Sequence, residues 1–223
     1  MNGPLACQNT PVITVDADVR PHVRPAWLVL DNVAVVEGAA SLETPLADAA
    51  AHMRTATESA DLTAAVRAMY RRFGVDPTKT RPSSEALLRR VRKGDPLPRI
   101  NNVVDVCNWC SLELQVPYGL YDVTRIDGAI ELRTGRPGET YAGIRKDAVN
   151  VEGRLVLADA AGAFGNPTSD SARTMVTPAA TSILTVIFAT ASIGARDLER
   201  MLDTTSERMR AFAGGTERSR GVT

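Results

Sequence analysis

The spacing of apolar residues changes near residue 120 of this 223-residue chain. Between residues 45 and 114 alanine, leucine, valine and methionine recur at intervals of three and four, which is the spacing of one helix face. From residue 121 onward, short segments rich in β-branched residues follow one another between turn signals, as is typical of strands. Strand candidates also precede the helical part, and an amphipathic helix follows the strands, at residues 12–15, 27–36 and 195–212. This order predicts an α+β fold.

Capping residues and turn signals set the expected boundaries. Ser83 or Ser84 begins a helix that Gly94 ends, and Asn101 or Asn102 begins the next one, over residues 100–114. Glu152 and Gly153 predict a hairpin turn between residues 148 and 159.

No low-complexity linker or internal repeat divides the chain. We therefore expect residues 1–60 to be a strand-helix part of one compact unit and residues 61–213 to be its main domain, including the last helix. Residues 214–223 (GGTERSRGVT) are glycine-rich and polar, so we expect a flexible tail.

Charge is balanced over the whole chain but not along it. The formal net charge is zero, yet residues 67–99 contain ten basic and three acidic side chains. This basic segment is either a solvated helix face or a footprint for nucleic acid. Under the second interpretation the candidate RNA-binding residues are Arg81, Arg89, Arg90, Arg92, Lys93 and Arg99.

Several site chemistries lack the residues they need. The chain has two histidines, His22 and His52, too few to favour a histidine triad or a histidine metal cluster. No phosphate-loop motif occurs. Cys107 and Cys110 form an isolated C-x-x-C pair, for which core packing is favoured over metal or redox chemistry. We expect no metal and no cofactor. Without a leader-like start or a membrane-length apolar run, we expect a cytoplasmic protein.

Two polar segments remain as candidate sites. The first is the helix of residues 100–114, where Asn101, Asn102, Asp105 and Asn108 share one to two turns. These side chains either cap the helix and satisfy a neighbouring loop, or contact a substrate. The second is residues 164–171 (FGNPTSDS), where a Gly-Asn-Pro turn precedes Thr168, Ser169, Asp170 and Ser171. Turn chemistry explains these residue types but not the length of the polar run.

The segment of residues 99–139 carries a specific order of residues. It is Arg99, Val103, Val104, Asp105, Val106, Asn108, Pro117, Tyr121, Asp122, Ile126, Gly128, Ile130, Arg133, Gly138 and Glu139. In this order and spacing the chain resembles the B3/B4 domain of the phenylalanyl-tRNA synthetase β subunit. The likeness extends over about residues 65–190 and also covers free-standing B3/B4 proteins with a Gly-Asn-Pro-Thr-Ser-Asp loop.

The resemblance implies mixed β-sheets forming a sandwich flanked by helices, with a central pocket. In the synthetase that pocket hydrolyses tyrosine wrongly attached to tRNA. Here Gly119 stands where the family has a histidine and Pro167 lies at or beside a family glutamate, so a different ligand is expected. The partners implied are tRNA or aminoacyl-tRNA and an amino acid or aminoacyl small molecule, with no membrane and no DNA.

Residue roles follow from the resemblance together with the polar loop. Asp170 is expected to orient a water or bind an α-ammonium group, with Ser169 and Thr168 as donors to an ester carbonyl. The expected substrate-binding residues are Asn101, Asn102, Asp105, Asn108, Tyr118, Gly119 and Asn166. Three functions stay open: trans-editing hydrolysis of an aminoacyl-tRNA, non-catalytic binding of tRNA or an amino acid, and aminoacyl transfer from tRNA in metabolite biosynthesis.

Overall fold

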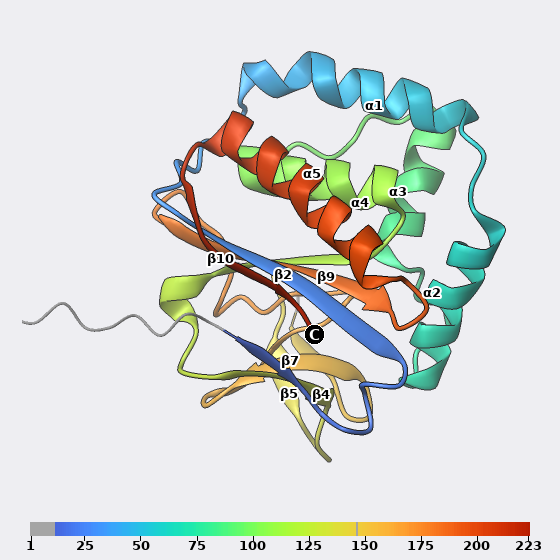
Figure 1. The fold of residues 1–223 in the computed structure, drawn as a ribbon, viewed down its shortest axis with the longest axis vertical. Coiled ribbons are helices and arrows are strands. Elements are labelled where there is room, and N and C mark those ends of the chain that lie inside the picture. The colour runs from blue at the N-terminus through green and yellow to red at the C-terminus, as the bar shows by residue number, and fades with distance from the viewer. Residues whose placement is uncertain (1–11, 146) are drawn as a thin grey trace, which may run out of the picture.

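Two four-stranded sheets pack face to face, and helices cover the outer face of one of them (Figure 1). The computed structural model describes residues 12–145 and 147–223. Within these residues the strands are β1 (Ile13–Val15), β2 (Val23–Asp31), β3 (Tyr118–Asp122), β4 (Ile130–Thr134), β5 (Thr140–Ala142), β6 (Ala148–Asn150), β7 (Leu155–Asp159), β8 (Gly162–Gly165), β9 (Ser182–Thr190) and β10 (Thr216–Val222). The α-helices are α1 (Glu43–Thr55), α2 (Ala60–Arg72), α3 (Ser83–Arg92), α4 (Asn102–Leu114) and α5 (Ala195–Ala213), with 3₁₀ turns η1 (Ala40–Leu42) and η2 (Val123–Arg125). The fold is α+β, as expected.

The sheet next to the helices has the strand order β10-β2-β9-β3, and the second sheet has the order β1-β4-β7-β8. Strands β2 and β9 pair antiparallel along nine residues, from Val23 opposite Thr190 to Asp31 opposite Ser182. Both strands are buried on two faces, by the helices and by the other sheet, which explains their uninterrupted apolar sequences. Strands β5 and β6 form a separate two-stranded ribbon.

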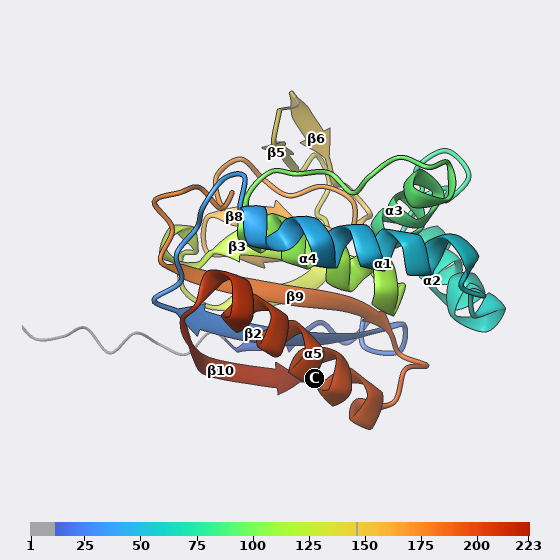
Figure 2. The same cartoon turned by 90° about the horizontal axis from the view of Figure 1, so that it is seen from above.

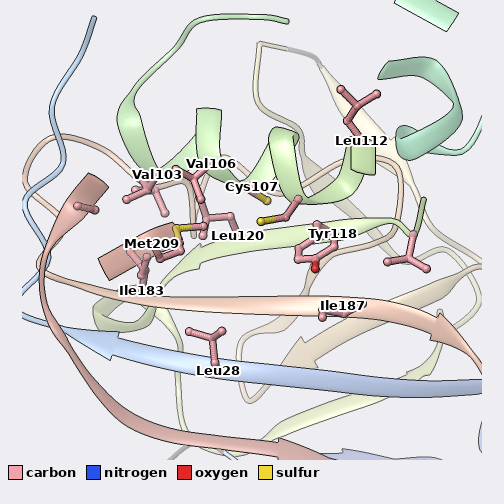
Figure 3. Close-up of a cluster of buried hydrophobic side chains, with 14 of the residues drawn as sticks. Leu28, Val103, Val106, Cys107, Leu112, Tyr118, Leu120, Ile183, Ile187 and Met209 are labelled. Carbon is pink, nitrogen blue, oxygen red and sulfur yellow. The ribbon is translucent and has the colours of Figure 1, made fainter. Parts of the chain in front are cut away.

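Alternate residues of the central strands supply two cores. Leu28, Ile183 and Ile187 face the helices, where they join Val106 of α4 and Met209 of α5 (Figure 3). Trp27, Val29, Leu184 and Phe188 face the second sheet. Helix α2 runs beside the sandwich and adds Val66, Met69, Tyr70 and Phe73 to this second core (Figure 2).

Two expectations about the second half are wrong. Residues 214–223 are not a flexible tail, because β10 pairs antiparallel with β2 from Thr216 to Val222. Ion pairs hold the polar side chains of β10, as between Arg220 and both Glu217 and Asp203. The polar composition that predicted a flexible tail is therefore that of an ion-paired strand. The turn at Glu152 and Gly153 exists, but the strands on its two sides do not form a hairpin, since β6 pairs with β5 and β7 pairs with β4.

Candidate functional site

The polar loop of residues 164–171 begins with a turn closed by Asn166. The Asn166 side-chain oxygen accepts hydrogen bonds from the backbone N–H groups of Thr168, at 2.8 Å, and Ser169, at 2.9 Å. An asparagine that binds the backbone two and three residues ahead is ordinary turn chemistry. Those two amide protons are consequently engaged inside the loop.

Two tyrosine hydroxyls from other elements fix the same loop. Tyr70 of α2 donates to the carbonyl oxygen of Pro167 at 2.9 Å, and the Asn166 amide donates to the Tyr141 hydroxyl at 2.8 Å. Tyr141 in turn donates to the carbonyl oxygen of Ser169. Each of these bonds ties the loop to a distant part of the chain, so the loop has one defined shape.

A small cavity separates this loop from α2. Its lining is largely apolar, with Arg154, Asn166 and Thr168 as polar groups, and its water-accessible volume is about 20 Å³. That volume holds about one water molecule. Asn166 and Thr168 thus line a cavity with room for about one water molecule.

Asp170 stands at the far end of the loop, across from β8. It forms an isolated antiparallel bridge with Gly165, and paired residues of such a bridge direct their side chains to the same face. A Cβ atom added to Gly165 would lie 2.3 Å from the Tyr121 hydroxyl, and one added to Gly119 would lie 2.2 Å from it. The Tyr121 ring therefore occupies the space that two missing side chains leave open, on the face to which Asp170 points.

The charge state of Asp170 is unusual. The residue is partly exposed, but its Oδ1 atom is inaccessible and has no hydrogen-bond partner among the described residues; the same holds for the Tyr121 hydroxyl. Burial raises the pKa of Asp170 to about 7, while the Tyr121 hydroxyl and the backbone N–H of Leu120 act in the opposite direction. A carboxyl group with this pKa exchanges protons at neutral pH, which is what a general base requires.

Tyr121 is the site residue that sequence reasoning missed. It belongs to the segment that resembles the synthetase domain, but neither its residue type nor its neighbours pointed to a role. A signal was present, since Gly119 precedes it by two residues on the same face of β3. The second glycine, Gly165, is 44 positions away in the sequence, and only the fold brings it to Tyr121.

The polar residues of α4 have structural partners. The Asn101 side chain caps the helix by accepting from the N–H of Val104 at 3.0 Å. Asn102 donates to two carbonyl oxygens and accepts from one amide, while Asp105 accepts from Arg99 and from the N–H of Ile100, both at 2.8 Å. These contacts favour the capping and packing interpretation over substrate contact.

The expected cleft joining Asp105 to Asp170 is not formed. Asp105 and Cys107 lie about 200° apart around α4, and Cys107 is the one near Asp170, whose negative charge helps to raise the pKa of this thiol. Asp105 is therefore directed away from the loop. Asn108, which is half-buried, lies on the same side of the helix as Asp105.

Tyr118 also points away from the loop. Its side chain lies in the core between β3 and the helices (Figure 3), and its hydroxyl is 3.0 Å from that of Thr205 on α5. Residues three apart in a strand point to opposite faces, so Tyr118 lies in the core next to the helices and Tyr121 in the core between the sheets. The expected contact of Tyr118 with a substrate finds no support in this position.

Most of the candidate RNA-binding residues are engaged within the protein. Arg81 pairs with Glu85, Arg92 with Glu58 and Arg99 with Asp105. Arg90 donates to the carbonyl oxygen of Pro96. Among the residues that the structure describes, the exposed side chains of Arg89 and Lys93 have no ion-pair or hydrogen-bond partner. Of the six candidate RNA-binding residues, these two cations are the ones left available to a polyanion.

The two cysteines of the C-x-x-C pair lie in the core, as the sequence interpretation favoured. Cys107 and Cys110 are buried, and burial raises the pKa of both thiols, which favours packing. In the described ranges no group of three or more histidine, cysteine, aspartate or glutamate side chains is arranged to hold a metal ion. No described helix combines the length and the apolar character that crossing a membrane requires.

Comparisons with known proteins point to one family. The phenylalanine–tRNA ligase beta subunit of Thiobacillus denitrificans is 36% identical over 90 residues, which are 40% of this chain and 11% of that subunit. A solved N-terminal fragment of the phenylalanyl-tRNA synthetase beta subunit from Pyrococcus horikoshii is 12% identical, with a TM-score of 0.49, and the match covers 96% of this chain and 54% of that one. The profile of the B3/4 domain matches residues 65–221, more than half of the chain, and the chain therefore belongs to the B3/4 domain family.

Proposed function

We propose that this protein hydrolyses the ester bond of an aminoacyl-tRNA, acting on tRNA in the cytoplasm in a trans-editing reaction. One observation carries the proposal: Asp170 presents a buried, unpaired carboxyl oxygen beside the Tyr121 hydroxyl, with a pKa of about 7. Membership of the B3/4 domain family and the partial likeness to a tRNA ligase subunit supply the substrate class.

An aminoacyl ester suits a site of this kind, because the bond is already activated. Asp170 removes a proton from a water molecule as the water oxygen attacks the ester carbon. The C–O bond to the ribose then breaks, and the proton passes to the departing ribose hydroxyl. Positioning of the water supplies the rest of the catalysis, since no covalent nucleophile takes part.

The developing negative charge on the carbonyl oxygen needs a hydrogen-bond donor. The backbone N–H groups of Thr168 and Ser169 already donate to Asn166. We therefore assign the role to side-chain hydroxyls of the loop. Thr168 lines the cavity, and its hydroxyl, which donates to the Tyr70 hydroxyl over 3.4 Å, can rotate to donate to a bound ester instead.

The test is a panel of aminoacyl-tRNAs, each incubated with the wild-type protein and scored for release of the amino acid. We expect one or a few of them to be deacylated faster than in buffer. If none reacts but tRNA or a free amino acid raises the melting temperature, the protein is a binding module. If the aminoacyl group instead appears on an added amine, the protein is a transferase.

Arg89 and Lys93 provide a separate prediction about tRNA binding. Replacing both by alanine is expected to weaken tRNA binding and to reduce the steepness of its salt dependence, by about 0.9 in the logarithmic slope for each phosphate that is no longer neutralised. Arg196, an exposed arginine of α5 with no partner among the described residues, supplies the control Arg196→Ala. Equal salt slopes for the double variant and the wild type would exclude α3 as the tRNA-binding surface.

A further inference from the structure

Two buried polar atoms without partners lie beside each other in the site. They are the Tyr121 hydroxyl and Oδ1 of Asp170, neither of which completes a hydrogen bond of normal geometry with a described residue. A buried group left unpaired destabilises a protein by about 1 to 3 kcal/mol. One group is a donor and the other an acceptor, so a single contact between them removes both penalties.

The backbone around them is arranged to bring these two side chains together. Gly165 pairs with Asp170 across an antiparallel bridge, and the position of its missing Cβ lies 2.3 Å from the Tyr121 hydroxyl. The ring cannot turn away easily, because it packs edge-on against Phe164 with 5.0 Å between the ring centres and is buried in the core between the sheets. The hydroxyl is thus held on the side to which Asp170 points.

We propose that Tyr121 is a positioning residue for Asp170: its hydroxyl donates to the carboxylate, holding that side chain in one orientation and favouring its charged form. The inference rests on the proposed function only for its effect on activity. No bond to substrate is assigned to Tyr121. Glycine at positions 119 and 165 makes this placement of Tyr121 possible, since any larger residue there would displace the Tyr121 ring.

The other titratable groups around Asp170 cannot take over this role. Burial raises the pKa of Cys107 on α4 and of Tyr141 on β5, and the charge of Asp170 adds to both shifts. The Tyr141 hydroxyl already donates to the carbonyl oxygen of Ser169. The backbone N–H of Leu120 also favours the charged carboxylate, but it is fixed in β3 and remains in any Tyr121 variant.

The deciding experiment is the titration of Asp170 in Tyr121→Phe, followed through the carboxyl carbon signal by NMR and assigned with Asp170→Asn. Loss of the donated hydrogen bond is expected to raise the pKa of Asp170 by about 1 to 2 units. Tyr118→Phe is the matched control, because Tyr118 lies on the same strand with its hydroxyl next to Thr205, and it is expected to leave the Asp170 midpoint unchanged. An unchanged midpoint in Tyr121→Phe would overturn the inference.

The activity measurement separates this inference from the proposed function. On a substrate that the wild type deacylates, the rising limb of the pH profile is expected to move upward by the same amount in Tyr121→Phe, so that the rate at pH 6 falls about tenfold for each unit. The plateau at high pH is expected to stay. A fall of the plateau with no movement of the limb would contradict a positioning role. If no substrate reacts with wild type, the function proposal fails while the titration still decides the role of Tyr121.

Discussion

At pH 8, Asp170→Asn is expected to melt at a higher temperature than the wild type while deacylating aminoacyl-tRNA about 10²- to 10⁴-fold more slowly. The activity is lost because an amide cannot accept a proton from water. The stability is gained because burial disfavours the charged carboxylate that the wild type holds at this pH, whereas the amide carries no charge. The measurements are single-turnover deacylation and thermal unfolding on the same preparations.

The direction of the pH effect follows from the pKa of Asp170, which is about 7 in the folded protein and 3.8 for the free side chain. A carboxyl group with a raised pKa contributes stability below about pH 4, and that contribution is lost as the pH rises to 7 and above. The whole difference corresponds to roughly 4 kcal/mol. Asp170→Asn is therefore expected to flatten the decline in stability between pH 4 and 8.

The control for this prediction is Asp48→Asn, which changes an exposed aspartate of α1 in the same chemical way. It is expected to alter neither the deacylation rate nor the pH dependence of the melting temperature. If Asp170→Asn keeps the wild-type pH dependence, Asp170 does not titrate near neutrality and cannot be the base.

Asn102→Ala is expected to destabilise the protein by about 3 to 5 kcal/mol. The buried Asn102 amide donates to the carbonyl oxygens of Ala34 and Phe212, both at 2.8 Å, and its oxygen accepts from the N–H of Val36 at 2.8 Å. Alanine leaves all three backbone groups without this partner, and so loosens the junction of α4, α5 and the segment after β2.

Asn108→Ala provides the comparison, because Asn108 belongs to the same helix, is half-buried and makes no side-chain hydrogen bond to a described residue. Its replacement is expected to change the free energy of unfolding by about 0.5 kcal/mol or less. Denaturant unfolding of both variants measures the difference. Equal losses would show that the three bonds of Asn102 contribute little to stability.

The sequence predicted those features of the fold that depend on local pattern. The helix expected from Ser83 or Ser84 is α3, but its N-cap is Pro82 and neither serine caps it. The helix expected from Asn101 or Asn102 is α4, which the Asn101 side chain caps, because a capping residue acts within a few positions of itself. The strand β10 was missed because its polar side chains find ion-pair partners on α5, which no local pattern reveals. Strands β6 and β7 do not form a hairpin, because each pairs with another strand, β6 with β5 and β7 with β4.

The site was predicted in part for the same reason. Residue type selected Asp170 and the Gly-Asn-Pro turn selected its loop, but the burial that raises the pKa of Asp170 is a product of the fold, and the β3 groups that lower it, the Tyr121 hydroxyl and the Leu120 N–H, lie about 50 positions earlier in the sequence. The polar residues of α4 had two explanations that the sequence could not separate. Their hydrogen-bond partners lie as far as 110 positions away, as for Asn102 and Phe212.

The bonds that Tyr70 and Tyr141 make to the loop of residues 164–171 have a consequence for how specificity changes in evolution. A loop held in one shape before a ligand arrives loses little conformational entropy when it binds, so recognition proceeds by fit to a preformed surface. Homologues with other ligands are then expected to keep both tyrosines and the asparagine, and to exchange the side chains around that rigid frame.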